Sequence, residues 1–408
     1  MNKKGSTVSI ILITLIVFIA GVFFFTKYFN KSTSHVGNQS ANNLPITAIP
    51  NPTDSSLGVA TSAQEAASSV KTRVPFFAHY YLWWDDNHWL SKLGPSYPRT
   101  ASPLALPATL ESDGCTATTP NVGDTLIDIP APNVNLYTQD DPAILSIQVN
   151  EAANAGLSGF VVSWSGNGQA AQTSSSTVIN KRLDALVNAV NKFNDTHPQE
   201  FHLMIGYQGL DNGRNPRPDS WIMNDWQYFI DHYETNPAFQ LQQYSAKPIF
   251  MFLDSRKFAV PDIAAITTPY HNSLLLLGDE HGKTEWNRGI SSYFDGAGWY
   301  FSSQNPYTNA ASFTQLKTFS DLLKSQGKLW FSPLSSGYNK SNFNLGGGCV
   351  PRKDGQTLQL NYAGNKTSNP DGWMYISWNE YLENTYLEPS VLYGDFYLQA
   401  LQAIIKQN

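Results

Sequence analysis

The chain has 408 residues, of which 41% are hydrophobic and 14% charged, and its formal net charge is −6. This length suits one large domain with appendages, and the lack of a basic stripe excludes nucleic acid as an expected partner. The two Cys and eight His show no zinc-like spacing, and no phosphate loop or G-x-S-x-G elbow occurs, so no metal or cofactor is expected.

The N-terminus carries the pattern of a membrane-spanning helix. Lys3 and Lys4 precede an 18-residue apolar run from Val8 to Phe25, which is longer than a typical signal-peptide core. No small-residue cleavage pattern follows this run. We therefore expect residues 1–31 to form an uncleaved signal anchor, with the N-terminus cytoplasmic and the rest of the chain extracellular. A cleaved signal peptide is the alternative.

Residues 32–72 are predicted to form a disordered linker. The stretch from Ser32 to Ser69 is rich in Ser, Asn, Thr, Ala and Pro, is nearly free of charge and has no sustained periodicity. Such a segment buries too little apolar surface to offset the entropy that ordering it would cost. The folded domain is accordingly expected over residues 73–408.

Eight short apolar runs in this domain predict strands. They are VPFFAHYYLWW from Val74, SGFVVSW from Ser158, FHLMIGY from Phe201, KPIFMFLD from Lys247, SLLLLG from Ser273, DGAGWYF from Asp295, KLWFSPL from Lys328 and WMYISW from Trp373. Helical patterns lie between several of them. The helical patterns begin at Asp141, Val178, Asp219, Ala311 and Pro389. The first ends on Gly156 and the fourth on Gly327, and the third begins with an Asp-Ser cap.

The alternation of strands and helices predicts an α/β fold of the (β/α)8 TIM-barrel type with long βα loops. Residues 93–139 have no periodicity and many Pro, Ser and Thr residues, so we expect an elaborated loop after the first strand. A doubly wound open sheet is the rival architecture. It would place a Gly-rich phosphate turn after the first strand, and none is there.

In a barrel of this type the functional face lies where the strands end. The predicted strand ends carry many aromatic residues around a few carboxylates, which is the composition of a glycan-binding cleft. They are Trp83, Trp84, His88, Trp89, Trp164, Tyr207, Asp254, Trp299, Tyr300, Tyr338, Asn379, Glu380 and Glu383. Taken singly, each aromatic residue is also compatible with packing against a helix.

Glu380 and Glu383 form the candidate catalytic pair. Cleavage of a glycosidic bond needs one carboxyl group that protonates the leaving oxygen and another that acts as nucleophile or base. Three positions apart at a strand exit, the two side chains can point into one cleft if the chain turns there. For an E-x-x-E pattern alone, a solvated acidic loop is the alternative.

The segment SWNEYLENTYLEPS resembles the NEWHEGTxIEP signature of glycoside hydrolase family 99, the retaining endo-α-mannosidases, which are (β/α)8 barrels. FFAHYYLWWDDNHW is similar to that family's YYxWY…HW, and DDPAILSIQVNEAANAGLSGFVVSW to its DP…QI…AGIxxxVVSWW. FIDHYETNPAFQLQQYSAKPIFMFLDS resembles its YxxHPAFY…KPVFYVYDS. Matches of this kind extend over about 300 residues.

The resemblance implies a role for each carboxyl group. Glu380 would accept the proton of the sugar's own 2-hydroxyl, which attacks the anomeric carbon to give a 1,2-anhydro sugar. Glu383 would protonate the leaving oxygen and later activate water, a substrate-assisted variant of the usual scheme. The implied partner is a polysaccharide or oligosaccharide, contacted by further residues. These are Tyr80, Tyr81, Trp84, His88, Trp89, Trp164, Tyr207, Asp254, Tyr300 and Asn379.

The sequence departs from the family pattern around the catalytic pair. Leu382 and Asn384 flank Glu383 where the family has His and Gly, Ser165 replaces a Trp, and the third strand lacks the family's His and Glu. Glycosidase activity is therefore better supported than specificity for α-mannan. A glycan-binding protein of the same fold without activity is the alternative. A glycosyltransferase has less support because no D-x-D or nucleotide motif is present.

The two cysteines fall in loops on either side of the strand that carries Glu380. Cys115 lies in the loop after the first strand and Cys349 in the loop after the seventh. In a closed barrel both loops rise on the same face, so an oxidising exterior would allow a disulfide between them. Two unpaired buried thiols are the alternative.

Overall fold

The computed structural model describes residues 73–93, 114–115, 126, 128–131, 134, 136–167, 174–198, 200–340 and 348–408. The chain divides into two units, Met1–Ser69 and Val70–Asn408, and every described residue belongs to the second. The predicted signal anchor and the linker lie outside the described residues. Within the part that is described, no helix is long and apolar enough to span a bilayer.

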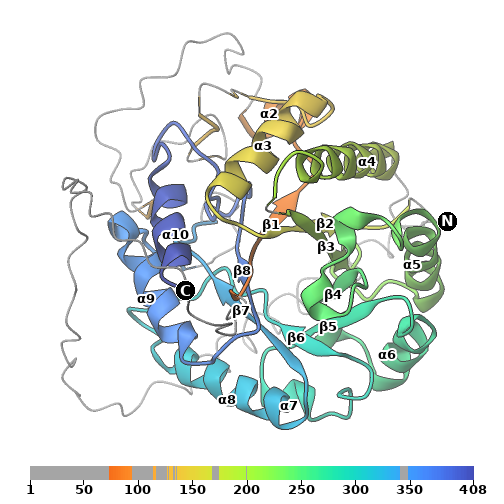
Figure 1. The fold of residues 1–408 in the computed structure, drawn as a ribbon. Coiled ribbons are helices and arrows are strands. Elements are labelled where there is room, and N and C mark those ends of the chain that lie inside the picture. Colours follow the sequence, from red (N-terminus) through yellow and green to blue (C-terminus); the bar gives the residue numbers. More distant parts are fainter. Residues whose placement is uncertain are drawn as a thin grey trace, which may run out of the picture. The chain divides into compact units, whose positions relative to one another are not determined.

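Eight parallel strands close into a barrel in the order β1 to β8 (Figure 1). The strands are β1 Phe76–Tyr81, β2 Gly159–Trp164, β3 His202–Gln208, β4 Ile249–Leu253, β5 Leu275–Asp279, β6 Gly296–Gly298, β7 Leu329–Leu334 and β8 Gly372–Tyr375. Each of them coincides with one of the eight predicted runs, and β3, β5 and β8 each extend one residue beyond theirs. The (β/α)8 barrel predicted from the sequence is therefore confirmed.

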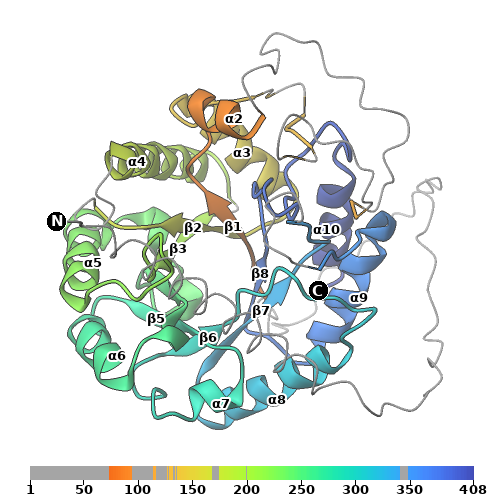
Figure 2. The ribbon, with the colours of Figure 1, turned by 180° about the vertical axis from the view of Figure 1, so that it is seen from behind.

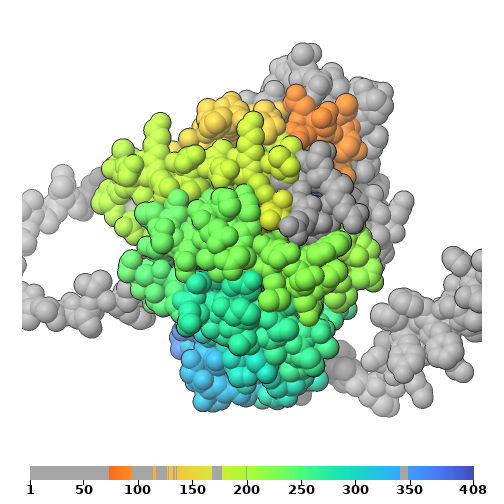
Figure 3. Space-filling view, turned by 90° about the vertical axis from the view of Figure 1, so that its right-hand side faces the viewer, coloured from red at the N-terminus to blue at the C-terminus, as the bar shows by residue number. Residues whose placement is uncertain are grey.

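The helices form an outer layer around the strands, seen from both ends of the barrel in Figures 1 and 2. They are α2 Asp86–Leu93, α3 Pro142–Asn154, α4 Ser174–Asn194, α5 Asp219–Tyr233, α6 Val260–Thr267, α7 Lys283–Trp286, α8 Ala311–Ser325, α9 Gln356–Lys366 and α10 Phe396–Lys406. Short 3-10 turns are η1 Pro237–Phe239, η2 Gln242–Tyr244, η3 Ser255–Lys257, η4 Thr268–Tyr270 and η6 Lys353–Gly355. In Figure 3 the middle of the chain, coloured yellow-green to cyan, covers one side of the barrel.

Some helix boundaries differ from the prediction. The last helix begins at Phe396 rather than at Pro389, because residues 389–395 form turns in which Ser390 pairs with Gly394. The helix α5 is preceded by Pro218 as its cap residue and has no side-chain capping bond, so the predicted Asp-Ser cap is wrong. The helix α4 starts four residues before Val178. The helix α2, which follows β1 closely, was not predicted, and the predicted loop of residues 93–139 begins where it ends.

The strands bury side chains on both faces. Inside the barrel, alternate positions of the strands supply a compact apolar cluster that includes Phe77, Val161, Met204, Met251, Leu277, Phe331 and Met374. The positions between them pack outward against the helices in a larger cluster. A third cluster supports the βα loops near β1 and β8 and contains Trp84, Trp89, Tyr137, Tyr381 and Tyr386. This third cluster lies directly beneath the segment that carries the candidate catalytic pair.

The β2 glycine at position 159 offers a test of this packing. A Cβ atom placed there would lie 1.9 Å from the main-chain oxygen of His202, on the neighbouring strand β3. We expect Gly159→Ala to lower the free energy of unfolding by at least the roughly 1–3 kcal/mol typical of overpacking. Equilibrium unfolding in urea measures this change. Gly348→Ala is the control, because a Cβ at Gly348 meets no atom within 4 Å. Equal stabilities of the two variants would contradict the packing described.

Candidate active site

Glu380 lies just beyond β8, at the mouth of the barrel where the parallel strands end. Its main-chain N–H donates to the Ser377 hydroxyl (2.8 Å), and its Oε1 accepts a hydrogen bond from the Leu382 N–H (2.9 Å). The residue is 4% exposed. Burial raises the pKa of the Glu380 carboxyl well above its ordinary value, and the neighbouring Glu383 carboxylate raises it further. A carboxyl group in this setting holds its proton more tightly than one in water.

Glu383 lies beside Glu380 and is only partly buried. Burial raises the pKa of its carboxyl, while the Ser302 hydroxyl and the cations Lys340 and Arg214 oppose that rise. Among the described residues, its Oε2 atom has no hydrogen-bond partner. The structure thus brings the two predicted catalytic carboxyl groups together. Lys340 and Arg214 act on Glu383, while Lys92 is the cation that acts on Glu380.

Tyr81 and Tyr300 complete the immediate surroundings of the pair. Tyr81 ends β1 and Tyr300 follows β6, yet their hydroxyl oxygens lie 2.6 Å apart. Burial raises the pKa of both phenols well above the ordinary value, and both Glu380 and Glu383 add to the rise. Four predicted site residues, from three strand ends, therefore share one small space.

Asp254 lies across the mouth at the end of β4. Its carboxylate pairs with Arg256 (2.6 Å) and more loosely with Arg214 (3.7 Å). Its main-chain N–H donates to Asp279, whose other carboxylate oxygen accepts the N–H of Tyr300. Asp254 is therefore connected to the catalytic side of the mouth through Asp279, which fixes the backbone at both places.

Asn379 is fully buried and its side chain binds the end of β1. Its Oδ1 accepts the Tyr81 N–H (2.9 Å), and its Nδ2 donates to the Tyr81 carbonyl (3.0 Å). The indole of Trp84 donates to the Asn379 carbonyl (2.8 Å). The side-chain amide of this predicted substrate-binding residue thus holds β1 and β8 together beyond their last paired residues.

Five other predicted substrate-binding residues pack inside the protein. They are Tyr80, Trp84, Trp89, Trp164 and Tyr207, and each is at most 2% exposed. Their polar atoms already have protein partners. The Tyr80 hydroxyl donates to Gln148 and the Tyr207 hydroxyl to Asp225. The indole N–H groups donate to oxygens of other residues: Trp84 to Asn379, Trp89 to Tyr137 and Trp164 to Asn180. Their packing shapes the walls that hold the site.

The aromatic surface at the first strand end is supplied instead by Trp83 and His88. The Trp83 ring stacks on Tyr81, with ring centres 4.4 Å apart, and His88 stacks on the far side of Trp83. Burial lowers the pKa of His88 to about 4, so this ring is neutral near pH 7. Partly buried rings next to the carboxylate pair are suited to packing against a sugar face.

Glu388, the third carboxyl group of the signature segment, lies in a buried polar network. It accepts hydrogen bonds from Gln148 (2.6 Å), Tyr137 (2.9 Å) and Tyr381 (3.1 Å). Burial raises the pKa of Glu388 to about 8, so it is mostly protonated at pH 7. Because Tyr381 follows Glu380 directly, this network anchors the catalytic segment from below.

Several residues of the mouth were missed by sequence reasoning. Asp279 ends the fifth strand, and the strand-end rule could have found it. Arg214, Ser302 and Lys340 lie within loops that have no pattern, so no sequence signal placed them near Glu383. No group of three or more His, Cys, Asp or Glu residues suited to a metal ion occurs in the described part of the chain.

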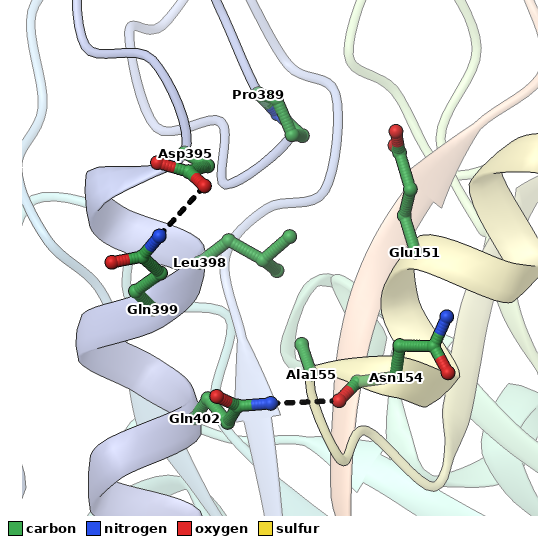
Figure 4. A pocket seen from close by; sticks show the side chains of 8 residues that line it. All are labelled: Glu151, Asn154, Ala155, Pro389, Asp395, Leu398, Gln399 and Gln402. Atoms are coloured by element: carbon green, nitrogen blue, oxygen red, sulfur yellow. Dashed lines mark hydrogen bonds between the residues drawn. The ribbon is translucent and has the colours of Figure 1, made fainter.

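A shallow groove of about 390 Å³ lies between α3 and α10, away from these residues (Figure 4). It is lined by Glu151, Asn154, Ala155, Pro389, Asp395, Leu398, Gln399 and Gln402. Two hydrogen bonds seen in Figure 4 tie its lining together, from Gln399 to Asp395 and from Gln402 to the Asn154 carbonyl. It contains none of the predicted site residues.

A closed (β/α)8 barrel with one buried and one partly buried carboxyl group side by side at its C-terminal mouth has the type of site that glycoside hydrolases use. Two structures of the GH99 endo-alpha-mannosidase from Bacteroides thetaiotaomicron are similar to this chain. They have TM-scores of 0.61 and identities of 18% and 17%, and the match covers 81% of this chain and 96% of theirs. A further solved structure, a glycoside hydrolase-like protein, has a TM-score of 0.57 at 12% identity and covers 84% of this chain and 96% of its own.

The sequence comparison agrees with the structural one. A mouse (Mus musculus) glycoprotein endo-alpha-1,2-mannosidase-like protein is 22% identical over an alignment of 366 residues that covers 82% of this chain and 74% of the mouse protein. No model of a known protein family matches the chain. The predicted resemblance to glycoside hydrolase family 99 is confirmed by the names and folds of these relatives.

The carboxylate pair predicts a measurable titration. Because burial and Glu383 both raise the pKa of Glu380, we expect this carboxyl group to stay protonated at a higher pH than an ordinary Glu. Infrared difference spectroscopy detects its C=O stretch, which Glu380→Gln should remove. Glu383→Gln should lower the pKa of Glu380, because it removes the neighbouring negative charge. A Glu380 carboxyl group that titrates like an ordinary Glu would contradict the geometry.

Proposed function

We propose that this protein is a membrane-tethered extracellular glycoside hydrolase that cleaves an α-linked, mannan-like glycan internally and with retention. The observation that carries the proposal is the enclosure of Glu380 and Glu383 with Tyr81 and Tyr300 at the mouth of the barrel. The similarity to endo-α-mannosidases of the same fold supports the substrate class.

The first chemical step uses the sugar's own 2-hydroxyl as the nucleophile. Glu380 accepts the 2-hydroxyl proton while O2 bonds to the anomeric carbon, and the bond from that carbon to the leaving oxygen breaks. Glu383 donates its proton to the leaving oxygen. The products of this step are a 1,2-anhydro sugar, the departed glycan, a protonated Glu380 and an ionised Glu383.

The second step reverses the roles and restores both groups. Glu383 takes a proton from a water molecule, whose oxygen attacks the anomeric carbon and opens the three-membered ring. Glu380 returns its proton to O2. Because the anomeric carbon is inverted twice, the overall configuration is retained. Two carboxyl groups suffice, and neither forms a bond to the sugar.

The scheme requires one proton on the pair, located on Glu383 when the sugar is bound. In the free protein, burial favours the proton on Glu380 more strongly. A 2-hydroxyl that donates a hydrogen bond to Glu380 stabilises its ionised form and so lowers its pKa. Substrate binding thereby shifts the proton toward the leaving-group side. Activity should therefore fall as the pH rises through the pKa of Glu380, which lies above that of an ordinary Glu, because the pair then loses its single proton. It should also fall at low pH, where both carboxyl groups become protonated.

Binding without cleavage is the second candidate function. It is favoured by one observation: the end of β3, where the family has His and Glu, holds Tyr207 tied to the buried Asp225–Arg217 ion pair. Incubating the protein with a panel of α-mannans and other α-glycans distinguishes the two. Release of oligosaccharides supports the hydrolase, whereas tight binding without release supports the alternative.

The catalytic assignment predicts that both carboxyl groups are required. Glu380→Gln and Glu383→Gln should each lower kcat by at least about 100-fold on the best substrate, because each removes a proton transfer from the first step. Glu200→Gln, an exposed residue at the opposite end of β3, is the matched control and should retain full activity. Near wild-type rates for either active-site variant would refute the assignment.

The tether predicts where the active protein is found. Residues 1–31 should hold the protein in the membrane fraction, and proteolysis between Ser32 and Ser69 should release an active soluble fragment. N-terminal sequencing of the mature protein is the check. A mature form that begins after Phe25 would favour a cleaved signal peptide instead.

A further inference from the structure

The main chain of Glu383 is bound by the loop that follows β7. The Asn339 N–H donates to the Glu383 carbonyl (2.7 Å), a short contact between the seventh and eighth βα loops. The Asn339 side chain is turned the other way, and its Nδ2 donates to the Gly114 carbonyl (2.7 Å). Asn339 is 5% exposed, so both bonds are shielded from water. One residue thus connects Glu383 to the loop after β1.

A covalent bond also joins the loop after β1 to the loop after β7. Gly114 is followed by Cys115, which forms a disulfide with Cys349, with Cα atoms 5.6 Å apart. The disulfide considered in the sequence is therefore present. Next to it, Tyr338 and Val350 exchange two main-chain hydrogen bonds of 3.0 and 2.8 Å. The residue before Asn339 and the residue after Cys349 are thus paired, and the disulfide and Asn339 form one unit.

Arg352, in the same loop after β7, binds the chain just after Glu383. The buried Arg352 guanidinium donates to the carbonyls of Asn384 (3.0 Å) and Tyr386 (2.9 Å) and to the Ser336 hydroxyl (2.8 Å). Three tyrosine rings surround it at 4.5–4.7 Å. The backbone around Glu383 is therefore bound both at its own carbonyl and immediately afterwards.

These main-chain contacts around Glu383 matter because few side chains bind its carboxyl group. The Ser302 hydroxyl contacts this carboxyl group, but its Oε2 has no hydrogen-bond partner among the described residues, so side-chain contacts fix its direction only in part. The position of the carboxyl group then depends on the main chain that carries it. A proton donor displaced by about 1 Å can lose a large part of its effect on the rate.

We propose that Asn339, held by Gly114 and the Cys115–Cys349 disulfide, is a positioning residue that sets the direction of the Glu383 carboxyl group. This inference rests on the proposed function, in which Glu383 protonates the leaving oxygen. Asn339 does not reach the reacting atoms itself. It acts through the Glu383 carbonyl.

The test compares two substrates with the same glycosyl part in the full-length protein. One has a sugar leaving group, which needs a proton, and the other is the glycosyl fluoride, which departs without one. The parameter is kcat/KM, because it reports only the steps up to departure of the leaving group. We expect Asn339→Ala to lower kcat/KM at least about 10-fold on the sugar substrate and less than about 2-fold on the fluoride. A loss of overall structure would lower both equally.

Further variants test the contributions of the disulfide and of Asn339 separately. Reduction of the disulfide, or the double variant Cys115→Ser/Cys349→Ser, should give the same selective loss, and combining it with Asn339→Ala should add little. Asn339→Ser replaces the alanine variant if that variant does not fold. Asn191→Ala is the control, because Asn191 bonds Asn236 on the outer wall of the barrel. Equal losses on both substrates, or no loss on either, would overturn the proposal.

A readout without turnover keeps the two hypotheses apart. If the wild-type protein cleaves neither substrate, the proposed function fails, but the position of Glu383 can still be measured. Glu383 raises the pKa of Glu380, so its displacement in Asn339→Ala should lower the infrared-detected pKa of Glu380. An unchanged pKa of Glu380 in that variant would overturn the positioning role.

Discussion

Closure of the sheet between β1 and β8 is the constraint on which the site depends. The two strands pair from Phe76 with Trp373 to Ala78 with Tyr375, and Asn379 then continues the contact with two side-chain bonds to the Tyr81 main chain. Since Glu380 follows Asn379, the amide clamp also fixes the catalytic carboxyl beside the Tyr81 side chain. A barrel left open at this seam would separate the two halves of the site.

The chain's architecture could be predicted from the sequence because buried parallel strands have a strong local pattern. All eight strands coincide with predicted runs to within one residue, even the three-residue β6. The short helices α2, α6, α7 and α9 were missed, since their stability comes from packing rather than from caps or a long apolar stripe. The start of α10 was misplaced for a related reason: turns that depend on tertiary contacts precede it.

The catalytic pair was found because residue type and position agreed, whereas the aromatic residues were sorted less well. Trp83 and Trp84 are neighbours at the same strand end, but one stacks on Tyr81 and the other is buried with Trp89. Sequence cannot distinguish two such side chains, because the direction of each depends on the loop that covers it. The same holds for Lys340 and Arg214, whose proximity to Glu383 follows from loop conformation alone.

The electrostatics of the site are asymmetric, and the polar groups around it explain why. Glu380 is enclosed by phenols and main chain, while Glu383 faces the two cations at the rim. Beneath them, Glu388 is neutral at pH 7 and uses its carboxyl group only as part of a hydrogen-bond network. Three carboxyl groups within nine residues thus have three different environments, which burial and neighbours create without any metal-binding cluster in the described residues.

The disulfide also shortens the path along the covalent chain between the two strands that close the barrel. Its ring contains β2 to β7, while β1 and β8, the two strands that close the barrel, lie on the tails outside it. Without the bond, Phe76 and Trp373 are separated by nearly the whole domain. With it, the path runs 39 residues from Phe76 to Cys115 and 24 residues from Cys349 to Trp373. Loop-closure entropy then opposes the seam by about 1 kcal/mol less, and the most distant strand pairing in the chain becomes a comparatively local one.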